Sequence, residues 1–516
     1  MKLTHRSFKL LATSAAVFVL AGCASLTPEV LSQQEIESQS RADLKKRMAE
    51  IAPINDAITI EEAIARALKY NLDHRAKSLE MALASGQLEA GKFDMMPRLL
   101  ANAGYFSRDS DLLRSQDFNG TNSFNPYISS ERNRSTQDLT LSWSLLDFGA
   151  SYYNAKQNAD RLLIATERRR KSMHTLIQNV RTTYWRALAA QTLSQRVSSA
   201  IVDAETALKD SRGMQAAKVR SPSESLRFQR TLLDNLRQLE ALQRELTTAK
   251  VELASLIGAP TGTRLTLTEP TDAEPQALGI SLEAMETQAL TRNADLREAN
   301  YNVRIAANDT RKAILKLLPG ISFDYGTRRD DDRFLINQNW QEASARVSLN
   351  LFNLLSAPSQ KRAAEAAESV MQARRMALQM TVFTQVHLSW HQYDDAVRQY
   401  QRAYAIADVD GQLAQIAGAQ EQSQMAGRLD RISLDVISIL SVARRYQSMA
   451  RVQEALSRMQ STLGLEPEVG SLDELDLPAL QKTMDQSLKN WKRQMQTKSA
   501  PQARRSVEQN QTESQT

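Results

Sequence analysis

The sequence is poor in cysteine and in residues that break regular structure. It holds one cysteine among 516 residues, which excludes an internal disulfide. With only 17 glycines, 13 prolines and 6% aromatic residues, the composition favours long uninterrupted elements, mostly helices. After residue 30 no uncharged apolar run approaches about 18 residues, so no transmembrane helix is expected. A hydrophobic content of 42% excludes a wholly disordered chain.

The N-terminal segment at 1–22 has the pattern of an export signal. Lys2, Arg6 and Lys9 form a positive region, and the apolar stretch at 10–20 is too short to span a bilayer. This stretch ends in Leu-Ala-Gly-Cys, which is similar to the lipobox of bacterial lipoproteins. The similarity implies cleavage before Cys23 and acylation there, by diacylglycerol and palmitate. The alternative is a plain signal peptide with an incidental cysteine.

The net charge gives no sign of a nucleic-acid partner. Removal of the signal takes away three positive charges, so the formal charge falls from +6 to +3. No basic stripe with interleaved aromatic residues is present, and the chain is predicted to be exported.

The sequence matches itself at two offsets, which indicates an internal duplication. At an offset of 222 the matches include Ile58/Ile280, Asn71/Asn293, Asp73/Asp295, Arg75/Arg297 and Pro97/Pro319. At an offset of 206 they include Ser142/Ser348, Leu145/Leu351, Val180/Val386, Ala249/Ala455 and Gly258/Gly464. The first half therefore carries a longer loop between Pro97 and Ser142.

Each half shows the same predicted order of elements. A helix from Thr59 to about Met95 ends before Pro97, because proline disfavours helix in the preceding residue, and its counterpart runs from about Ser281 to Pro319. Two strands follow in each half, and the later ones show period-2 alternation. Long helices are then predicted at about 150–213, 223–257, 357–420 and 428–463. In the second of these, leucines at a mean step of about 3.4 residues are typical of a coiled-coil seam.

The resulting map has six parts. They are a signal peptide at 1–22, an N-terminal segment at 23–57, a first repeat at 58–260 with a strand hairpin at 98–147, an inter-repeat segment at 261–280, a second repeat at 281–466 with a strand hairpin at 320–352, and a C-terminal segment at 467–516 whose end is expected to be disordered.

The predicted strands are too few to cross a membrane alone. Leu139, Leu141 and Trp143 alternate with polar residues, which gives one apolar and one polar face. Strands of about ten residues have the length of tilted membrane-spanning strands. A spanning sheet has no open edges, and the smallest such barrels use eight strands, so four strands per chain require oligomerisation. The alternative is two soluble hairpins packed on a helical body.

The duplication and the order of elements resemble the TolC family of bacterial outer-membrane efflux and secretion channels, in its lipoprotein branch. The resemblance covers about 58–466. It rests on the order of elements: a helix that ends at Pro97, a strand, a loop, a second strand and a long helix. The second strand and the turn after it read Leu-Ser-Trp-Ser-Leu-Leu-Asp-Phe-Gly at 141–149, and the second copy has Leu-Asn-Leu-Phe-Asn at 349–353. Asn-Leu and Asn-Ala at 71–72 and 293–294 depart from the Asn-Pro that is frequent in the family.

The resemblance implies a mostly α-helical fold and a homotrimer. Each chain would contribute four strands to one twelve-stranded β-barrel in the outer membrane, and its long coiled-coil helices would form an α-helical barrel in the periplasm. The segments outside the repeats would form a collar. The partners implied are outer-membrane lipid, a periplasmic adaptor and an inner-membrane pump, which would supply the energy of transport.

The family also implies a gate at the periplasmic helix tips, sometimes formed by a ring of acidic residues. Counting back from Gly464 predicts Asp430, whereas the local pattern predicts Asp435, and both remain candidates. Either could equally be a solvated acid near a helix N-terminus, stabilised there by the helix dipole. Arg428 and Arg431 are close in sequence and could fix the turn by ion pairs.

No enzymatic activity is predicted. The chain contains no phosphate-binding Gly-Lys-Ser/Thr loop and no Gly-x-Ser-x-Gly motif, and no cofactor is expected beyond the lipid at Cys23. His387 and His391 are four residues apart, but they lack the glutamate and third ligand of a zinc site, so no metal is expected. The competing functions are a structural lipoprotein of the envelope without a pore and, more remotely, a periplasmic adaptor.

Overall fold

The computed structural model describes most of the chain, and the described part divides into two units. The described residues are 30–115, 126–217, 221–260, 262–270, 275, 278–423, 427–465 and 475–496. The first unit ends at Asn55 and contains α2 (Gln33–Glu50), which the sequence did not predict. Its start is fixed by a capping box, in which Ser32 and Glu35 exchange hydrogen bonds of 3.2 and 2.8 Å.

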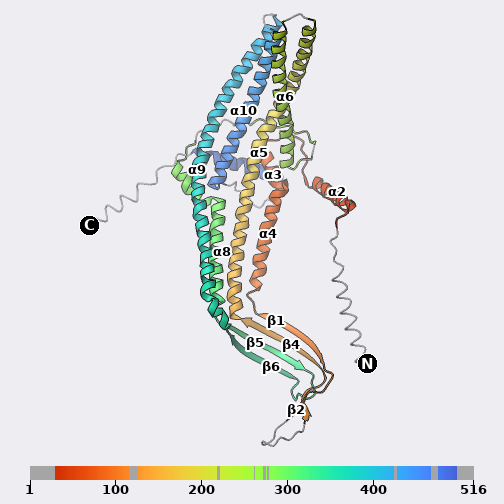
Figure 1. The fold of residues 1–516 in the computed structure, drawn as a ribbon, viewed down its shortest axis with the longest axis vertical. Coiled ribbons are helices and arrows are strands. Elements are labelled where there is room, and N and C mark those ends of the chain that lie inside the picture. Colours follow the sequence, from red (N-terminus) through yellow and green to blue (C-terminus); the bar gives the residue numbers. More distant parts are fainter. Residues whose placement is uncertain are drawn as a thin grey trace, which may run out of the picture. The chain divides into compact units, whose positions relative to one another are not determined.

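The second unit repeats one set of helices at two fixed spacings (Figure 1). The helices α3 (Ile60–Tyr70) and α4 (Leu72–Phe93) recur at the offset of 222 as α7 (Leu282–Arg292) and α8 (Ala294–Leu315). The helices α5 (Leu145–Ala216) and α6 (Pro222–Leu256) recur as α9 (Leu351–Gln422) and α10 (Arg428–Leu463), whose starts lie at the offset of 206. The helices of this unit therefore recur at the two offsets seen in the sequence.

The two helix stops of the repeats have the same environment. Gly258 and Gly464 both have positive φ, at 74° and 63°. An added Cβ would meet Tyr70 at the first glycine and Arg292 at the second, and Tyr70 and Arg292 are themselves equivalent at the offset of 222. Only glycine fits such a left-handed and crowded position.

The prediction of a single helix from Thr59 to Met95 is wrong, because one helix ends at Asn71 and a second one begins there. The backbone N–H of Asn71 donates to Ala67 at 2.9 Å, and its side chain accepts from the backbone N–H of His74 at 3.1 Å. Asn71 thus ends α3 and caps α4. Asn293 separates α7 from α8 in the same way.

A four-stranded antiparallel sheet lies at one end of this unit (Figure 1). Its strands, in spatial order, are β1 (Arg98–Ser107), β4 (Asn133–Ser144), β5 (Gly320–Asp330) and β6 (Asn339–Ser348). The predicted count of four strands omits a small hairpin of β2 (Leu113–Ser115) and β3 (Pro126–Ile128) within the first loop.

The long helices begin earlier than predicted. Leu145 and Leu351, expected to extend the strands, are already the first residues of α5 and α9. The side chain of Ser144 accepts from the N–H of Asp147 at 3.2 Å, and that of Asn350 accepts from the N–H of Phe352 at 3.1 Å. These caps end the period-2 pattern.

The long helices lie side by side. In one half of their length α6 packs on α5, α5 on α10, and α10 on α9. In the half next to the sheet, α4 packs on α5, and α8 lies between α5 and α9. No described helix has the combination of length and apolar character needed to cross a membrane.

A buried tyrosine holds the repeats to the segment between them. The hydroxyl of Tyr184 on α5 lies 2.8 Å from the carbonyl of Ile58 and 2.6 Å from that of Thr268. Ile58 forms an isolated parallel bridge with Leu267. The helix α11 (Leu477–Gln496) packs on α3 nearby, so segments from three distant parts of the chain meet here.

Two buried histidines make the stability of the fold depend on pH. Burial, with Arg169 near His74 and Arg170 near His174, lowers the pKa of each imidazole to about 4. Between the ordinary pKa of about 6.5 and this value, the unfolded chain binds protons that the folded chain does not. The contribution of these two histidines to the free energy of unfolding is therefore fully present above pH 6.5. It decreases as the pH falls toward 4, by up to about 1.4 kcal/mol per pH unit for each histidine.

We expect His74→Gln to flatten this slope between pH 7 and 5, measured as the thermal midpoint in detergent. His387→Gln is the matched control, because His387 is exposed beside Glu286. If the thermal midpoint varied equally with pH in both variants, His74 would not be a source of the pH dependence.

Candidate functional site

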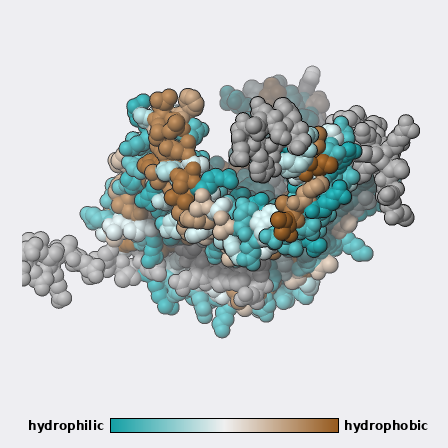
Figure 2. All heavy atoms as spheres, turned by 90° about the horizontal axis from the view of Figure 1, so that it is seen from below, coloured by the Kyte–Doolittle hydropathy of each residue, from teal (hydrophilic) through white to brown (hydrophobic). Residues whose placement is uncertain are grey.

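The sheet has two faces of opposite character. Directly paired residues share a face, so Leu99, Leu141 and Tyr325 form one apolar row across three strands. Trp143 and Phe323 extend the same face two residues along. Figure 2 views the molecule from this end and shows apolar surface in patches among hydrophilic surface. The predicted alternation is therefore present in the observed register.

The opposite face is polar and its side chains bond across the strands. Asn102 donates to Asp138 at 2.9 Å, and Arg328 pairs with Glu342 at 3.1 Å. The other polar members of this face are Arg98, Thr140, Ser142, Asp324, Ser344 and Arg346. This surface is suited to water, whereas the apolar face is suited to lipid.

Both edges of the sheet are open among the described strands. β1 pairs with β4 alone and β6 pairs with β5 alone. An edge of ten residues presents a row of backbone donors and acceptors that another strand can pair with.

The far end of the long helices contains the predicted gate residues. Asp430 and Asp435 both lie on α10 within the described residues. Asp430 lies exposed in the first turn of α10, and no ion pair of its carboxylate is found in the described part of the chain. Asp435 is half-buried and pairs with Arg196 of α5 at 3.1 Å. The structure thus does not bring the two aspartates into one site.

Ion pairs link α10 to its neighbours at this tip. Arg428 pairs with Asp210 of α5 at 3.1 Å. Arg431 pairs with Asp203 of α5 at 3.0 Å and with Glu421 of α9 at 2.6 Å. The predicted ion pairs of Arg428 and Arg431 are therefore confirmed, and they join separate helices.

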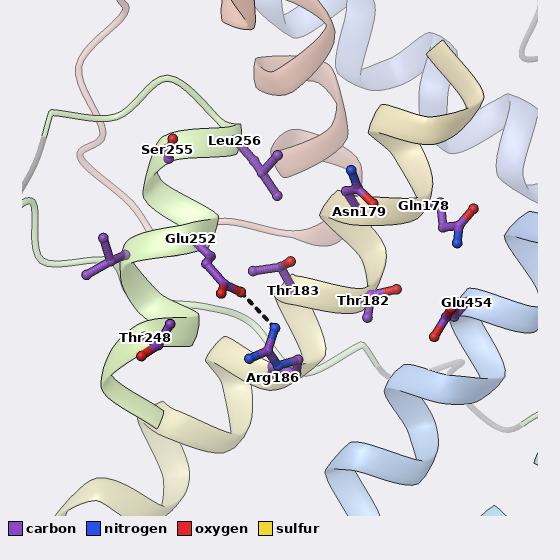
Figure 3. A pocket seen from close by; sticks show the side chains of 11 residues that line it. Gln178, Asn179, Thr182, Thr183, Arg186, Thr248, Glu252, Ser255, Leu256 and Glu454 are labelled. Atoms are coloured by element: carbon purple, nitrogen blue, oxygen red, sulfur yellow. Dashed lines mark hydrogen bonds and ion pairs between the residues drawn. The ribbon is translucent and has the colours of Figure 1, made fainter. Parts of the chain in front are cut away.

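A pocket of about 620 Å³ lies between α5, α6 and α10 (Figure 3). Within it, Arg186 of α5 forms an ion pair with Glu252 of α6 at 2.7 Å. Most of the other lining residues carry hydroxyl or amide groups, such as Thr183 and Asn179. No lining residue is a histidine or cysteine, so the pocket offers no Ser–His or Cys–His pair.

The remaining predicted residues lie elsewhere. Cys23 is outside the described residues. His387 pairs with Glu286 at 2.8 Å, and His391 packs against Trp390. Within the described ranges no group of three or more His, Cys, Asp or Glu residues could hold a metal ion.

Comparison with known proteins agrees with this fold. Residues 63–259 match the family described as outer membrane efflux protein. No curated protein is significantly similar to the chain.

Several solved outer-membrane channels share the fold. The CmeC channel of Campylobacter jejuni has a TM-score of 0.61 and 12% identity, covering 85% of this chain and 93% of that one. The MtrE channel of Neisseria gonorrhoeae has a TM-score of 0.58 and 16% identity, covering 78% and 88%. The VceC protein of Vibrio cholerae has a TM-score of 0.57 and 13% identity, covering 78% and 96%.

The first repeat thus carries the outer membrane efflux protein family pattern, and the described chain has the fold of these channels. The resemblance to TolC-family channels and the mostly α-helical fold class are confirmed.

Proposed function

We propose that this protein is a passive trimeric channel of the bacterial outer membrane. It exports small molecules or proteins across the periplasm and outer membrane as the outer part of a tripartite efflux or type I secretion system. The observation that carries this proposal is the two-faced sheet with two open edges.

Three copies complete the membrane-spanning wall. Three sheets of four strands give twelve strands, and each β6 edge then pairs with the β1 edge of the next copy. The apolar row through Leu141 contacts lipid, and the polar face through Asp138 surrounds the water-filled lumen. Closure satisfies the backbone groups that an open sheet would leave unpaired in lipid.

The long helices continue the duct into the periplasm. α5, α6, α9 and α10 supply the wall of the tube, and their tips contact a periplasmic adaptor bound to an inner-membrane pump. The segments at 23–57, 261–280 and 467–516 form the collar; the meeting of Ile58, Leu267 and Tyr184 supports a collar at this level. The pump supplies the energy of transport.

The test is planar-bilayer conductance of the purified protein, with its mass measured in the same detergent. Discrete conductance steps from a trimer are expected. A folded monomer without conductance would instead favour the structural lipoprotein, since that function needs neither a lumen nor partner copies.

Cys23 anchors the mature chain to lipid in this proposal. Cys23→Ser is expected to abolish incorporation of a labelled fatty acid completely, because no other thiol is available for the thioether. Ala24→Ser is the control and should label normally. Undiminished labelling of Cys23→Ser would refute the anchor while leaving the channel proposal intact.

A further inference from the structure

The duplication shows which helix is missing a partner. α8 packs against two of the described long helices, α5 and α9. Its counterpart α4 packs against one of them, α5. α9 is in turn the counterpart of α5 at an offset of 206. If neighbouring copies continue the arrangement, the free side of α4 faces α9 of another copy. The residues on these two surfaces test that expectation.

Within one chain, the seam between α5 and α8 is ionic. Glu167 of α5 pairs with Arg297 of α8 at 2.9 Å, and Lys171 pairs with Asp295 at 2.7 Å. The other pairs along this seam are Asp160 with Arg304 and Arg168 with Glu298.

The corresponding side of α4 is apolar and uncovered. Its residues recur at alternating steps of four and three, the spacing of a coiled-coil seam: Leu72, Ala76, Leu79, Leu83, Gly86, Ala90 and Phe93. All seven are exposed, and Leu79 and Leu83 are each 63% exposed. A Cβ added at Gly86 would meet nothing within 4 Å, so the groove there is open in the single chain.

The corresponding side of α9 carries a complementary apolar seam in which alanine predominates. At the positions equivalent to the α5 residues that face α8, and at the same coiled-coil spacing, lie Ala363, Ala366, Val370, Ala373, Ala377 and Met380. All six are exposed. Leucines on α4 opposite alanines on α9 allow close interlocking.

The end of the seam next to the sheet agrees with this arrangement. In the chain, Leu315 at the end of α8 packs against Gly149 of α5. Their counterparts are Phe93, 69% exposed, and Leu355, 78% exposed. Two large apolar side chains thus stand uncovered where the duplication predicts that they meet.

At the helix tips, charged residues of one half are likewise replaced by apolar residues at the equivalent positions of the other half. Asp203 and Asp210 of α5 form ion pairs with α10. Their counterparts on α9 are Val409 and Ile416, both 54% exposed. Their predicted partner helix in another copy is α6, the counterpart of α10. There Leu226 and Leu233 are exposed, although their own counterparts Ile432 and Ile439 are buried.

We infer that copies of this chain join head to tail through an apolar seam, with α9 of one copy against α4 and α6 of the next. In the part next to the sheet, the two halves within each chain join instead through the ionic seam between α5 and α8. This inference rests on the proposed trimer and specifies its interface. Because buried apolar contacts are insensitive to moderate salt and ion pairs are screened, the seam between copies keeps its strength at high salt.

Cysteine cross-linking tests the seam directly. Leu83 and Ala363 are the counterparts of Ile305 and Gln157, which lie in contact at 2.9 Å within the chain. The combined variant Leu83→Cys with Ala363→Cys, treated in membranes with a bismaleimide that spans about 10 Å, should give dimers and trimers on denaturing gels. Leu83→Cys with Lys361→Cys is the control, because Lys361 is at the same level about 200° around α9.

The outcomes separate the seam from the channel. We expect cross-links in the variant with cysteines at 83 and 363, also in 1 M salt, and none in the control variant. A conducting trimer without them, or with equal cross-links in the control, overturns the seam only. A cross-linked trimer without conductance overturns the channel only. A monomer without cross-links overturns both.

Discussion

Leu139→Arg is expected to prevent accumulation of the trimer in the outer membrane. Leu139 lies at the centre of β4 on the apolar face, opposite Ala101 of β1 and Thr327 of β5. An arginine on the lipid face of a barrel costs about 2–4 kcal/mol near the bilayer midplane, and the proposed trimer would carry three of them. The combined penalty is comparable to the whole stability of many domains.

Thr140→Arg is the matched control, because it introduces the same residue one position away on the polar face. We expect it to assemble normally and to alter only ion conductance. The measurement is the fraction of protein recovered as a trimer from outer membranes. Equal recovery of both variants would contradict the assignment of the two faces.

Repetition explains why much of the fold could be predicted from one sequence. The offsets of 222 and 206 provided each element with a second, independent pattern, so the leucine seam of α6 and the bounds of α10 were well constrained. Leu232, Leu239 and Leu253 of that seam are indeed fully buried.

Local capping explains most of the errors. Asn71 and Asn293 stand within apparently continuous helical patterns, and their side chains end one helix while starting the next. Ser144 and Asn350 likewise start helices within an alternating pattern. Hydrophobic periodicity carries no information about which polar side chain turns back to bond its own backbone.

The candidate site was predictable only in outline. The two faces of the sheet follow from alternation, but the open edges require knowledge of pairing, as does the difference between ionic and apolar helix seams. At the tip, sequence counting could not choose between Asp430 and Asp435. The choice depends on Arg196, which is far from Asp435 in sequence and reaches it only through the packing of α5 on α10.

Neutralisations at the tip should distinguish the two aspartates. In the proposed trimer, Asp430→Asn removes three exposed carboxylates from the helix tips. Three charges each about 8 Å from a passing ion contribute about 0.5 kcal/mol apiece in water, so cation preference should fall about tenfold. Asp435→Asn combined with Arg196→Gln should leave selectivity unchanged, because the two substitutions together remove an ion pair of zero net charge.

Reversal potentials in a salt gradient across a planar bilayer measure both variants. Asp435→Asn also releases Arg196, and an exposed pair of this kind contributes about 0.2–1 kcal/mol, so a modest rise in open probability is expected from that variant alone. A loss of selectivity in the Asp435→Asn, Arg196→Gln variant but not in Asp430→Asn would move the acidic ring to Asp435. Unchanged selectivity in both of these variants, and when all three substitutions are combined, would mean that neither aspartate forms it.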